Sequence, residues 1–578
     1  MTRSLRLVLI PILLLLGNSM TFASDARIVA EVESEIGGVK SATAAHAMAV
    51  TANPHATAAA LKILKKGGSA VDAAIAAQLV LGLVEPQSSG IGGGAFMLLW
   101  DAQQRRVSSW DGREEAPAAV AENHFLDASG KPMDFYDAVI GGHAVGVPGV
   151  VAMLWAAHQA HGVLPWAELF TPAITLAKHG FQISPRLYTL LEKSPKLAVN
   201  PEIQAYFFNK DGDGFAPKPV GALLKNPAYA QSLKAIAEGG VAEFYRGALA
   251  AKIVQAVQRD PNRAGLLSES DMASYAPRIQ APICAPYRQY QVCGAPPPSS
   301  GGTTVLGILG ILDARQSQKK SFWQHDFIES SRLAFADRNR YVADPVFTPV
   351  PTDGLVNTDY LNSRAALLSD QRLASVTAGQ PPGAVPVKDG ISKAMPSTSH
   401  LSIVDAKGNI LSMTTSIETA FGSRIMVGGF LLNNQLTDFS FAPKGEAGEL
   451  IANRIEAGKR PRSSMSPTLV FERGEPLMAI GSPGGARIID YVAGSLFKVL
   501  GLGWDLAPAI ASGHIVAMGD FLELEQGQFS EAQVQAISAL GHKPKLAAET
   551  SGLHGIMRVK GGWYGVADPR REGVAQGF

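Results

Sequence analysis

The chain has 578 residues and a formal net charge of +1, with 46% hydrophobic and 17% charged residues. The charged residues are scattered and form no basic patch or stripe, so we expect no nucleic-acid partner. Roughly 550 residues follow a short N-terminal targeting segment, which is enough for several domains. Because no Ser/Gly-rich or strongly charged linker divides them, we expect one large domain.

The first 23 residues have the pattern of an export signal. Arg3 and Arg6 precede an apolar run over residues 7–16, and small residues at the end of the segment suit a signal peptidase. A membrane anchor is the alternative, but the run is about half the roughly 20 residues that a bilayer span requires, and Pro11 interrupts it. We therefore expect residues 1–23 to be removed, and the mature protein to be periplasmic or secreted with no membrane segment.

Two helices are predicted within residues 58–84, separated by Gly67-Gly68. The second, over residues 71–84, is almost entirely apolar and too short for a membrane span, so we expect it in the core. The glycine-rich stretch 90–94 superficially looks like a phosphate-binding loop. Phosphate loops, however, run from strand to helix and end in Lys-Ser or Lys-Thr, whereas this stretch follows a helix and enters a strand. Close backbone packing explains these glycines better.

Residues 150–252 have a mostly helical pattern. In it, His158 and His161 lie three residues apart, but no carboxylate or third histidine accompanies them at ligand spacing. We interpret both as surface histidines and expect no metal site. A Pro-rich stretch then leads into a buried helix predicted over residues 304–312. The charges of an amphipathic helix predicted over residues 329–340 are most simply explained as a solvated face.

Two cysteines, Cys284 and Cys293, flank residues 285–290. A tight turn in this segment would place them opposite each other on a hairpin, and in an oxidising compartment they would form a disulfide. Two free, buried thiols on neighbouring strands explain the pattern equally well. Neither cysteine is expected to be a nucleophile or a metal ligand.

The character of the sequence changes at Thr398. Residues 375–397 are rich in Pro, Gly, Ala, Ser and Lys and lack apolar periodicity, which predicts a loose connector. From Thr398 polar and apolar residues alternate as in a strand, and Lys407-Gly408-Asn409 predicts a hairpin turn into a second strand over residues 410–416. Later strands are predicted over residues 468–471 and 477–480, before helices return after Ala486.

A Thr that begins a strand after a cleavable connector has what self-processing requires. Its hydroxyl must attack the carbonyl of Ser397 and release a new amino terminus. Thr398 would then carry a nucleophilic Oγ and an α-amine of pKa roughly 7.7–8.0, which serves as its base near neutral pH. A Thr at a strand edge usually has a structural role. Whether Thr398 is instead a nucleophile therefore has to be judged from the rest of the sequence.

Seven blocks of sequence occur in a specific order and spacing. They are Gly112-Arg113-Glu114-Glu115-Ala116-Pro117, residues 296–302, Asp337-Arg338, Thr398-Ser399-His400, residues 431–439 (LLNNQLTDF), residues 459–467 (KRPRSSMSP) and residues 481–485 (GSPGG). Together they resemble the γ-glutamyltransferase family of N-terminal-nucleophile hydrolases along nearly the whole mature chain. The resemblance implies an α+β fold, a four-layer αββα sandwich. It also implies a precursor cut between Ser397 and Thr398 into a large chain (24–397) and a small chain (398–578), which form one domain as a heterodimer.

The resemblance assigns catalytic roles. Thr398 is the expected nucleophile, and Ser416 stands where the family often has a Thr whose hydroxyl contacts it. Gly484 and Gly485 match the oxyanion-hole pair. Glycines suit that role because two backbone N–H groups can approach a developing negative oxygen without side-chain interference. Outside this block, a tight turn would be the simpler explanation of the two glycines.

The resemblance also implies how a γ-glutamyl head would bind. A carboxylate would be held by Arg113, with hydroxyl donors from Ser463 and Ser464. The α-ammonium would donate to Asp438, Gln435 and Glu418. Some family members carry Asn at the position of Glu418, and the additional carboxylate favours a substrate with an amine.

The expected reaction transfers a γ-glutamyl group through a Thr398 ester to water or to an amino acid, with glutathione as the first candidate donor and no cofactor. A glutaryl or cephalosporin acylase of the same fold is the main alternative, because the fold alone does not separate them. A periplasmic binding protein that never cleaves itself is a third. Whether residues 441–458 act as a lid over the cleft stays open at this level.

Overall fold

The computed structural model describes residue 38 and residues 40–578, apart from 319–321, 391, 393–394 and 396. The export signal expected at residues 1–23 lies outside the described residues. Within the described part of the chain, no helix is both long and apolar enough to cross a membrane.

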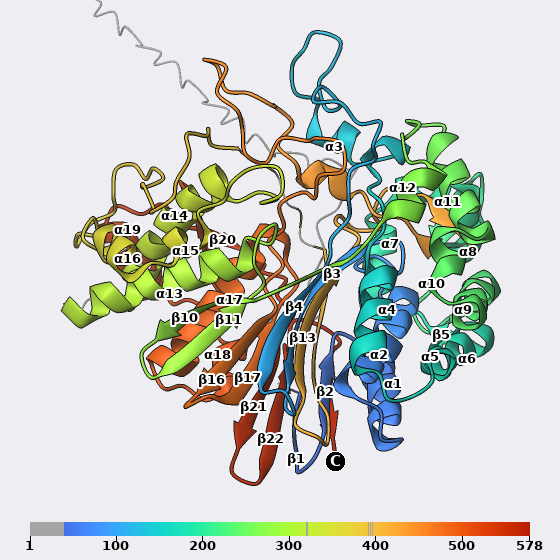
Figure 1. Ribbon diagram of the computed structural model, residues 1–578, viewed down its shortest axis with the longest axis horizontal. Helices are drawn as coiled ribbons and strands as arrows, with labels where there is room; N and C mark the ends of the chain where they lie inside the picture. The colour runs from blue at the N-terminus through green and yellow to red at the C-terminus, as the bar shows by residue number, and fades with distance from the viewer. Residues whose placement is uncertain (1–37, 39, 319–321, 391, 393–394, 396) are drawn as a thin grey trace, which may run out of the picture.

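Two seven-stranded antiparallel sheets are stacked at the centre of the molecule (Figure 1). The first contains, in spatial order, β1 (Lys40–Ala44), β22 (Gly562–Ala567), β21 (His554–Val559), β17 (Glu475–Gly481), β16 (Thr468–Glu472), β11 (Tyr290–Gly294) and β10 (Ile283–Tyr287). The second contains β23 (Val574–Gly577), β2 (Met48–Thr51), β12 (Ser399–Val404), β13 (Ile410–Ser416), β3 (Gly94–Asp101), β4 (Arg106–Gly112) and β9 (Arg278–Gln280). Apolar side chains fill the space between them, and the rings of Trp100 and Phe471 lie 5.1 Å apart there.

Helices cover the outer face of each sheet (Figure 1). The layer beside the second sheet contains α1 (Pro54–Lys65), α2 (Ala70–Val84), α4 (Val150–His161), α5 (Trp166–Leu169), α6 (Thr171–His179), α7 (Pro185–Glu192), α8 (Pro201–Phe207), α9 (Pro227–Gly239), α10 (Val241–Tyr245), α11 (Ala248–Gln258) and α12 (Glu269–Ser274). The layer beside the first sheet contains α13 (Gly301–Gln318), α14 (Trp323–Tyr341), α15 (Thr352–Leu355), α16 (Thr358–Ala365), α17 (Ile488–Leu496), α18 (Leu506–Ala511) and α19 (Glu531–Ala539). The predicted four-layer αββα sandwich is confirmed.

Short elements complete the fold. They are α3 (Phe135–Ala138) and the small sheets formed by β5 (Phe181–Gln182) with β8 (Leu223–Leu224), β6 (Phe208–Asp211) with β7 (Gly214–Pro217), β14 (Met426–Val427) with β15 (Phe430–Leu431), and β18 (Ile515–Met518), β19 (Phe521–Glu525) and β20 (Lys545–Ala547).

The apolar helix α2 is a core element, as predicted. Ser69 and Asp72 cap it reciprocally, each side chain accepting a hydrogen bond from the other residue's backbone N–H. Every residue of α2 is buried. The break predicted at Gly67-Gly68 separates it from α1.

The glycine-rich stretch 90–94 serves close backbone packing, as predicted. A Cβ atom on Gly92 would lie 2.2 Å from the carbonyl oxygen of Leu431, and one on Gly93 would lie 2.1 Å from that of Ser416. Both contacts are far too short for any side chain. The glycines thus allow the start of β3 to lie against the end of β13 and against the segment that carries the 431–439 block.

The predicted hairpin at Thr398 is confirmed. Strands β12 and β13 pair in register from Ser399 opposite Thr415 to Val404 opposite Ile410. The side chain of Asp405 closes the turn by accepting from the backbone N–H groups of Lys407 and Asn409. The connector before it, residues 375–397, forms no helix or strand in its described part.

Two interpretations from the sequence were wrong. The charges of α14 do not form a solvated face, because Glu329, Arg332, Asp337 and Arg338 are all buried. Neighbouring helices and loops cover this helix, and its charges are paired or hydrogen-bonded: Arg332 lies 2.6 Å from Glu329.

His158 and His161 are half-buried and not surface residues. The ring of His158 packs against Trp155 and Trp166, and its Nε2 lies 2.9 Å from the carbonyl oxygen of Leu164. His161 faces Asp101 at 3.4 Å.

The structure decides between the two explanations of the cysteines. Cys284 of β10 lies directly opposite Cys293 of β11, with Cα atoms 4.1 Å apart, and the two sulfurs are bonded. The pair is therefore a disulfide across the hairpin at the edge of the first sheet.

Candidate active site

The hairpin places Thr398 and Ser416 side by side at the end of the second sheet. Thr398 is the residue before β12, and Ser416 is the last residue of β13, so the register brings the two hydroxyls to 3.3 Å. The Thr398 hydroxyl donates to the carbonyl oxygen of Ser397, the residue before it. The Ser416 hydroxyl donates to the same oxygen at 3.3 Å. Two hydroxyls thus converge on the carbonyl that self-cleavage would attack.

Gly484 and Gly485 follow β17 and precede α17, on the facing sheet. Both have positive φ values, 138° and 60°, which favour glycine. A Cβ atom on Gly484 would lie 2.6 Å from the Tyr491 ring. Gly485 lines the same cavity as Thr398, so the turn ends beside the proposed nucleophile.

Arg113 and Asp438 form a buried ion pair. Arg113 follows β4 and Asp438 ends a short helical turn over Gln435–Asp438. Arg113 Nη2 lies 2.5 Å from Asp438 Oδ2, and Gln435 Nε2 donates to the same oxygen at 2.8 Å. Glu114 also faces the guanidinium, with Oε2 3.5 Å from Arg113 Nη1. Burial raises the pKa of Glu114 to about 8, although the charge of Arg113 opposes that shift.

Ser463 and Ser464 are held by a network that links three distant segments. The Ser463 N–H donates to the carbonyl of Pro298, and the Ser463 carbonyl accepts from Ser300. Arg338 joins both sides, because its Nη2 donates to Ser464 Oγ at 2.7 Å and its Nε donates to Ser300 Oγ at 2.9 Å. The Ser463 hydroxyl accepts from the backbone N–H of Met465.

Glu418 lies two residues beyond β13, in the left-handed region with φ 78°. Its backbone N–H donates to Ser416 Oγ at 2.9 Å, which couples the carboxylate-bearing turn to the hydroxyl beside Thr398. The side chain is 4% exposed, and its Oε2 has no hydrogen-bond partner among the described residues. Burial, followed by the nearby charge of Asp438, raises the pKa of Glu418 well above its usual value.

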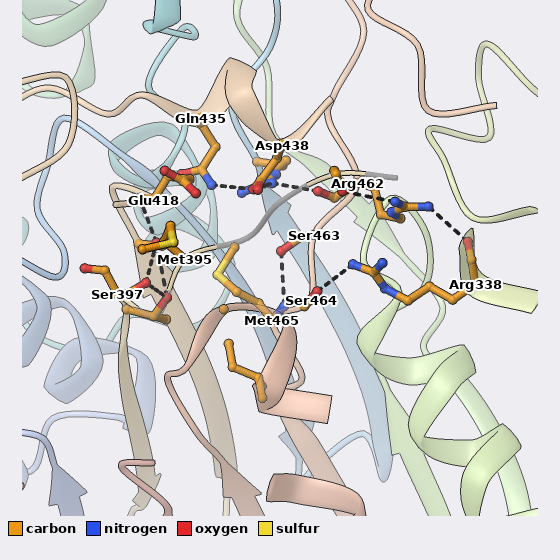
Figure 2. A pocket seen from close by; sticks show the side chains of 16 residues that line it. Arg338, Met395, Ser397, Glu418, Gln435, Asp438, Arg462, Ser463, Ser464 and Met465 are labelled. Atoms are coloured by element: carbon orange, nitrogen blue, oxygen red, sulfur yellow. Dashed lines mark hydrogen bonds and ion pairs between the residues drawn. The ribbon is translucent and has the colours of Figure 1, made fainter. Parts of the chain in front are cut away.

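All the predicted site residues except Gly484 line one cavity of about 30 Å³ (Figure 2). The lining residues are Arg113, Arg338, Ser392, Met395, Ser397, Thr398, Ser416, Glu418, Gln435, Asp438, Arg462, Ser463, Ser464, Met465, Gly485 and Ile488. Three of them, Ser392, Met395 and Ser397, belong to the connector. These three residues therefore occupy part of the space beside Thr398, and the remaining volume has room for little more than a water molecule or two.

Sequence reasoning did not select Arg338, Arg462, Glu114 or Met395 as site residues. The first three lie inside the sequence blocks that carry the family resemblance, and their position in these blocks could have marked them as candidate site residues. Nothing in the local pattern of the connector distinguishes Met395.

Residues 441–458 lie against the connector and do not line the cavity. The backbone N–H of Lys388 donates to the carbonyl of Leu450 at 3.0 Å. At its start, Phe441 stacks on Phe125 with ring centroids 4.4 Å apart. In the uncut chain this segment therefore covers part of the connector and not the cavity itself.

The comparisons with known proteins agree with this geometry. The family model described as gamma-glutamyltranspeptidase matches residues 56–578. A glutathione hydrolase proenzyme from Bacillus subtilis (strain 168) is 34% identical over 550 residues, covering 92% of this chain and 91% of the relative. One from Escherichia coli (strain K12) is 35% identical over 538 residues, covering 90% of each.

Among solved structures, a cephalosporin acylase from Bacillus halodurans matches with a TM-score of 0.80 and 25% identity, over 94% of this chain and 97% of that one. Likeness to an acylase and to glutathione hydrolases is expected of one fold that serves related acyl transfers. The chain is an enzyme of the γ-glutamyltranspeptidase family.

Proposed function

We propose that this protein is a self-processing γ-glutamyl amidohydrolase and transferase. The observation that carries the proposal is the position of the Thr398 hydroxyl, which donates to the carbonyl of Ser397 at the end of a cavity lined by Arg113, Asp438 and Glu418. One residue thus faces both the peptide bond to be cut and a site with charges for a glutamyl head.

Self-cleavage is the first reaction. Thr398 Oγ attacks the carbonyl carbon of Ser397, the C–N bond to Thr398 breaks, and the resulting ester is hydrolysed by water. The Ser416 hydroxyl, 3.3 Å from the Ser397 oxygen, helps to stabilise the negative charge that develops there. The products are a large chain ending at Ser397 and a small chain that begins with Thr398. Because both chains contribute strands to both sheets, we propose that they remain together as a heterodimer.

The second reaction uses the new amino terminus. The Thr398 α-amine accepts the hydroxyl proton as Oγ attacks the γ-amide, and the amine product leaves with that proton. The backbone N–H groups of Gly484 and Gly485 stabilise the oxyanion. Water or the amine of an amino acid then takes the γ-glutamyl group from the ester.

The charged and polar groups of the cavity bind the γ-glutamyl group of the substrate. Arg113, with Ser463 and Ser464, binds the α-carboxylate, and Asp438, Gln435 and Glu418 accept from the α-ammonium. Glutathione is the proposed donor, since the relatives above carry the name glutathione hydrolase. We also propose export to the periplasm or the medium, where the Cys284–Cys293 disulfide persists.

A glutaryl or cephalosporin acylase is the second candidate, because the cephalosporin acylase fold matches over most of the chain. The test compares hydrolysis of γ-glutamyl and glutaryl p-nitroanilides, which differ only in the α-amine. We expect at least about 10-fold higher kcat/KM for the γ-glutamyl compound, because Asp438 and Glu418 bind that amine. Faster turnover of the glutaryl compound would favour the acylase.

A further inference from the structure

Residues 549–552 contact the oxyanion turn (residues 482–485) without lining the cavity. The backbone N–H of Gly552 donates to Ser482 Oγ at 3.1 Å, and that hydroxyl donates to the carbonyl of Pro483 at 2.7 Å. This segment is therefore fixed to the first half of the turn.

Tyr491 joins the same segment to the second half of the turn. It lies in α17, three residues after Ile488, which lines the cavity together with Gly485. The Tyr491 ring packs against Gly484, where a Cβ atom would lie 2.6 Å from Tyr491 Cε2. The Tyr491 hydroxyl donates to the carboxylate of Glu549. The ring is thus held between Gly484 and Glu549, and its position limits where the Gly484 backbone can lie.

Arg487 is the second side chain that faces Glu549. It lies two residues after Gly485, and its Nε is 3.5 Å from Glu549 Oε2. Its Nη2 lies 2.7 Å from Glu523 Oε2, so two carboxylates face this guanidinium. Burial raises the pKa of Glu549 to about 7, although the Tyr491 hydroxyl and the charge of Arg487 oppose that shift. The carboxylate is therefore charged in assays above neutral pH.

A histidine also packs against Tyr491. The His514 ring centroid lies 4.5 Å from that of Tyr491, and His514 Nε2 lies 2.8 Å from Ser551 Oγ. Ser551 in turn donates to Asp568 Oδ2 at 2.6 Å. Tyr491, His514 and Asp568 are all buried, and Glu549 is only 1% exposed. The 549–552 segment thus reaches the hydroxyl of Tyr491 directly and its ring through His514.

We propose that Glu549 is a positioning residue for the oxyanion site. By holding Tyr491 and Arg487, it fixes the oxyanion turn so that two backbone N–H groups point at the negative oxygen as it forms. This inference rests on the proposed function, which assigns those N–H groups to the oxyanion, and extends it to a residue outside the cavity. A buried tyrosine hydroxyl usually has a partner for stability alone. Here the ring also contacts Gly484, so loss of the partner should weaken transition-state stabilisation.

The test compares substrate hydrolysis with self-cleavage in two variants, Tyr491→Phe and Glu549→Ala. Hydrolysis uses the glycine N–H groups, whereas self-cleavage takes place at the Ser397 carbonyl, which Ser416 contacts. We expect kcat for γ-glutamyl p-nitroanilide to fall about 10-fold or more in each variant, with KM changed less than about 2-fold, because the lost stabilisation belongs to the transition state. Both variants should cleave themselves at the wild-type rate on a denaturing gel.

Two further variants identify the contact responsible. In the Glu549→Ala background, Tyr491→Phe should lower kcat no further, because the Tyr491 hydroxyl has already lost its acceptor. Glu549→Gln should recover part of kcat. Its amide oxygen still accepts from the Tyr491 hydroxyl, but it carries no charge for Arg487.

Tyr229→Phe is the matched control. Tyr229 is fully buried, as Tyr491 is, and its hydroxyl donates to the carbonyl of Leu79 at 2.9 Å. It lies in α9, in the helix layer beside the second sheet, whereas the oxyanion turn follows a strand of the first. Tyr229→Phe should lower the melting temperature, as Tyr491→Phe does, but leave kcat and KM at their wild-type values.

The outcomes separate this inference from the proposed function. If the wild type hydrolyses γ-glutamyl p-nitroanilide and both variants keep its kcat, the inference is wrong and the proposed function stands. The inference is also wrong if self-cleavage slows as much as hydrolysis, or if Tyr229→Phe loses as much kcat as Tyr491→Phe. If Glu549→Ala fails to fold, Tyr491→Phe alone decides. If the wild type does not hydrolyse the anilide, the proposed function itself fails.

Discussion

The two ends of the cavity are built differently. At the nucleophile end, Thr398 and Ser416 are neighbours because of strand register, and Gly485 belongs to a turn beside them, so the groups are uncharged hydroxyls and backbone. At the head end, Arg113, Asp438 and Arg462 come from separate segments and carry buried charge. Substitutions should have smaller effects at the nucleophile end, where the backbone forms the site. They should have larger effects at the head end, where charged groups from distant segments meet in a low-dielectric interior.

The largest effect from a single change at the head end is expected from Asp438→Asn. This substitution keeps the shape but removes the charge that faces Arg113 at 2.5 Å. We expect kcat/KM for γ-glutamyl p-nitroanilide to fall about 100-fold or more, with a stability loss of about 3 kcal/mol, because the buried Arg113 loses its nearer carboxylate and keeps only Glu114 at 3.5 Å. Steady-state kinetics and denaturant unfolding measure the two effects. Asp313→Asn, at an exposed ion pair, should change neither.

A smaller effect is expected at the nucleophile end from Ser416→Ala. Loss of the hydroxyl that contacts both Thr398 and the Ser397 carbonyl should slow self-cleavage about 10-fold or more. Ser416→Thr should restore the rate, because it retains the hydroxyl. A time course of chain cleavage on a denaturing gel gives the rates. If the Ser416→Ala variant cleaves itself at the wild-type rate, the Ser416 hydroxyl has no role in self-cleavage.

Glu114 offers a test of the buried charge through pH. Its folded pKa of about 8 lies above the unfolded value of 4.5, so the folded state holds the proton more tightly between these values. Its contribution to stability is therefore full below pH 4.5 and is lost as the pH rises towards 8. In Glu114→Gln, the melting temperature should fall less between pH 5.5 and 8.5 than in the wild type. If the melting temperatures of the two proteins fall by the same amount over this pH range, Glu114 does not titrate in this way.

The smallest effect on activity is expected far from both ends, at the disulfide. Replacing Cys284 and Cys293 together by Ser should cost about 2.5 kcal/mol of stability, the amount expected for a closed loop of this length. The kcat of the folded enzyme should stay near that of the wild type, because the pair lies on the edge hairpin of the first sheet. Thermal unfolding and γ-glutamyl p-nitroanilide kinetics test both statements. A large loss of kcat would show that the β10–β11 hairpin contributes to the active site.

The same contrast explains what the sequence could predict. Local patterns were sufficient for α2, for the β12–β13 hairpin and for the close packing of the 90–94 glycines, because short-range propensity and turn chemistry determine them. They failed for α14, whose buried Glu329 and Arg338 have partners far along the chain. Arg462 and Met395 both line the cavity because of tertiary contacts, which the local pattern of the sequence does not predict.

The most direct test of the central claim is the identity of the residue exposed by cleavage. Purified wild-type protein should separate into two chains on a denaturing gel, and amino-terminal sequencing of the smaller should read Thr-Ser-His-Leu from Thr398. Thr398→Ala should remain one chain and lack activity towards γ-glutamyl p-nitroanilide. An intact single chain that still hydrolysed this substrate, or a small chain that began at another residue, would contradict the account.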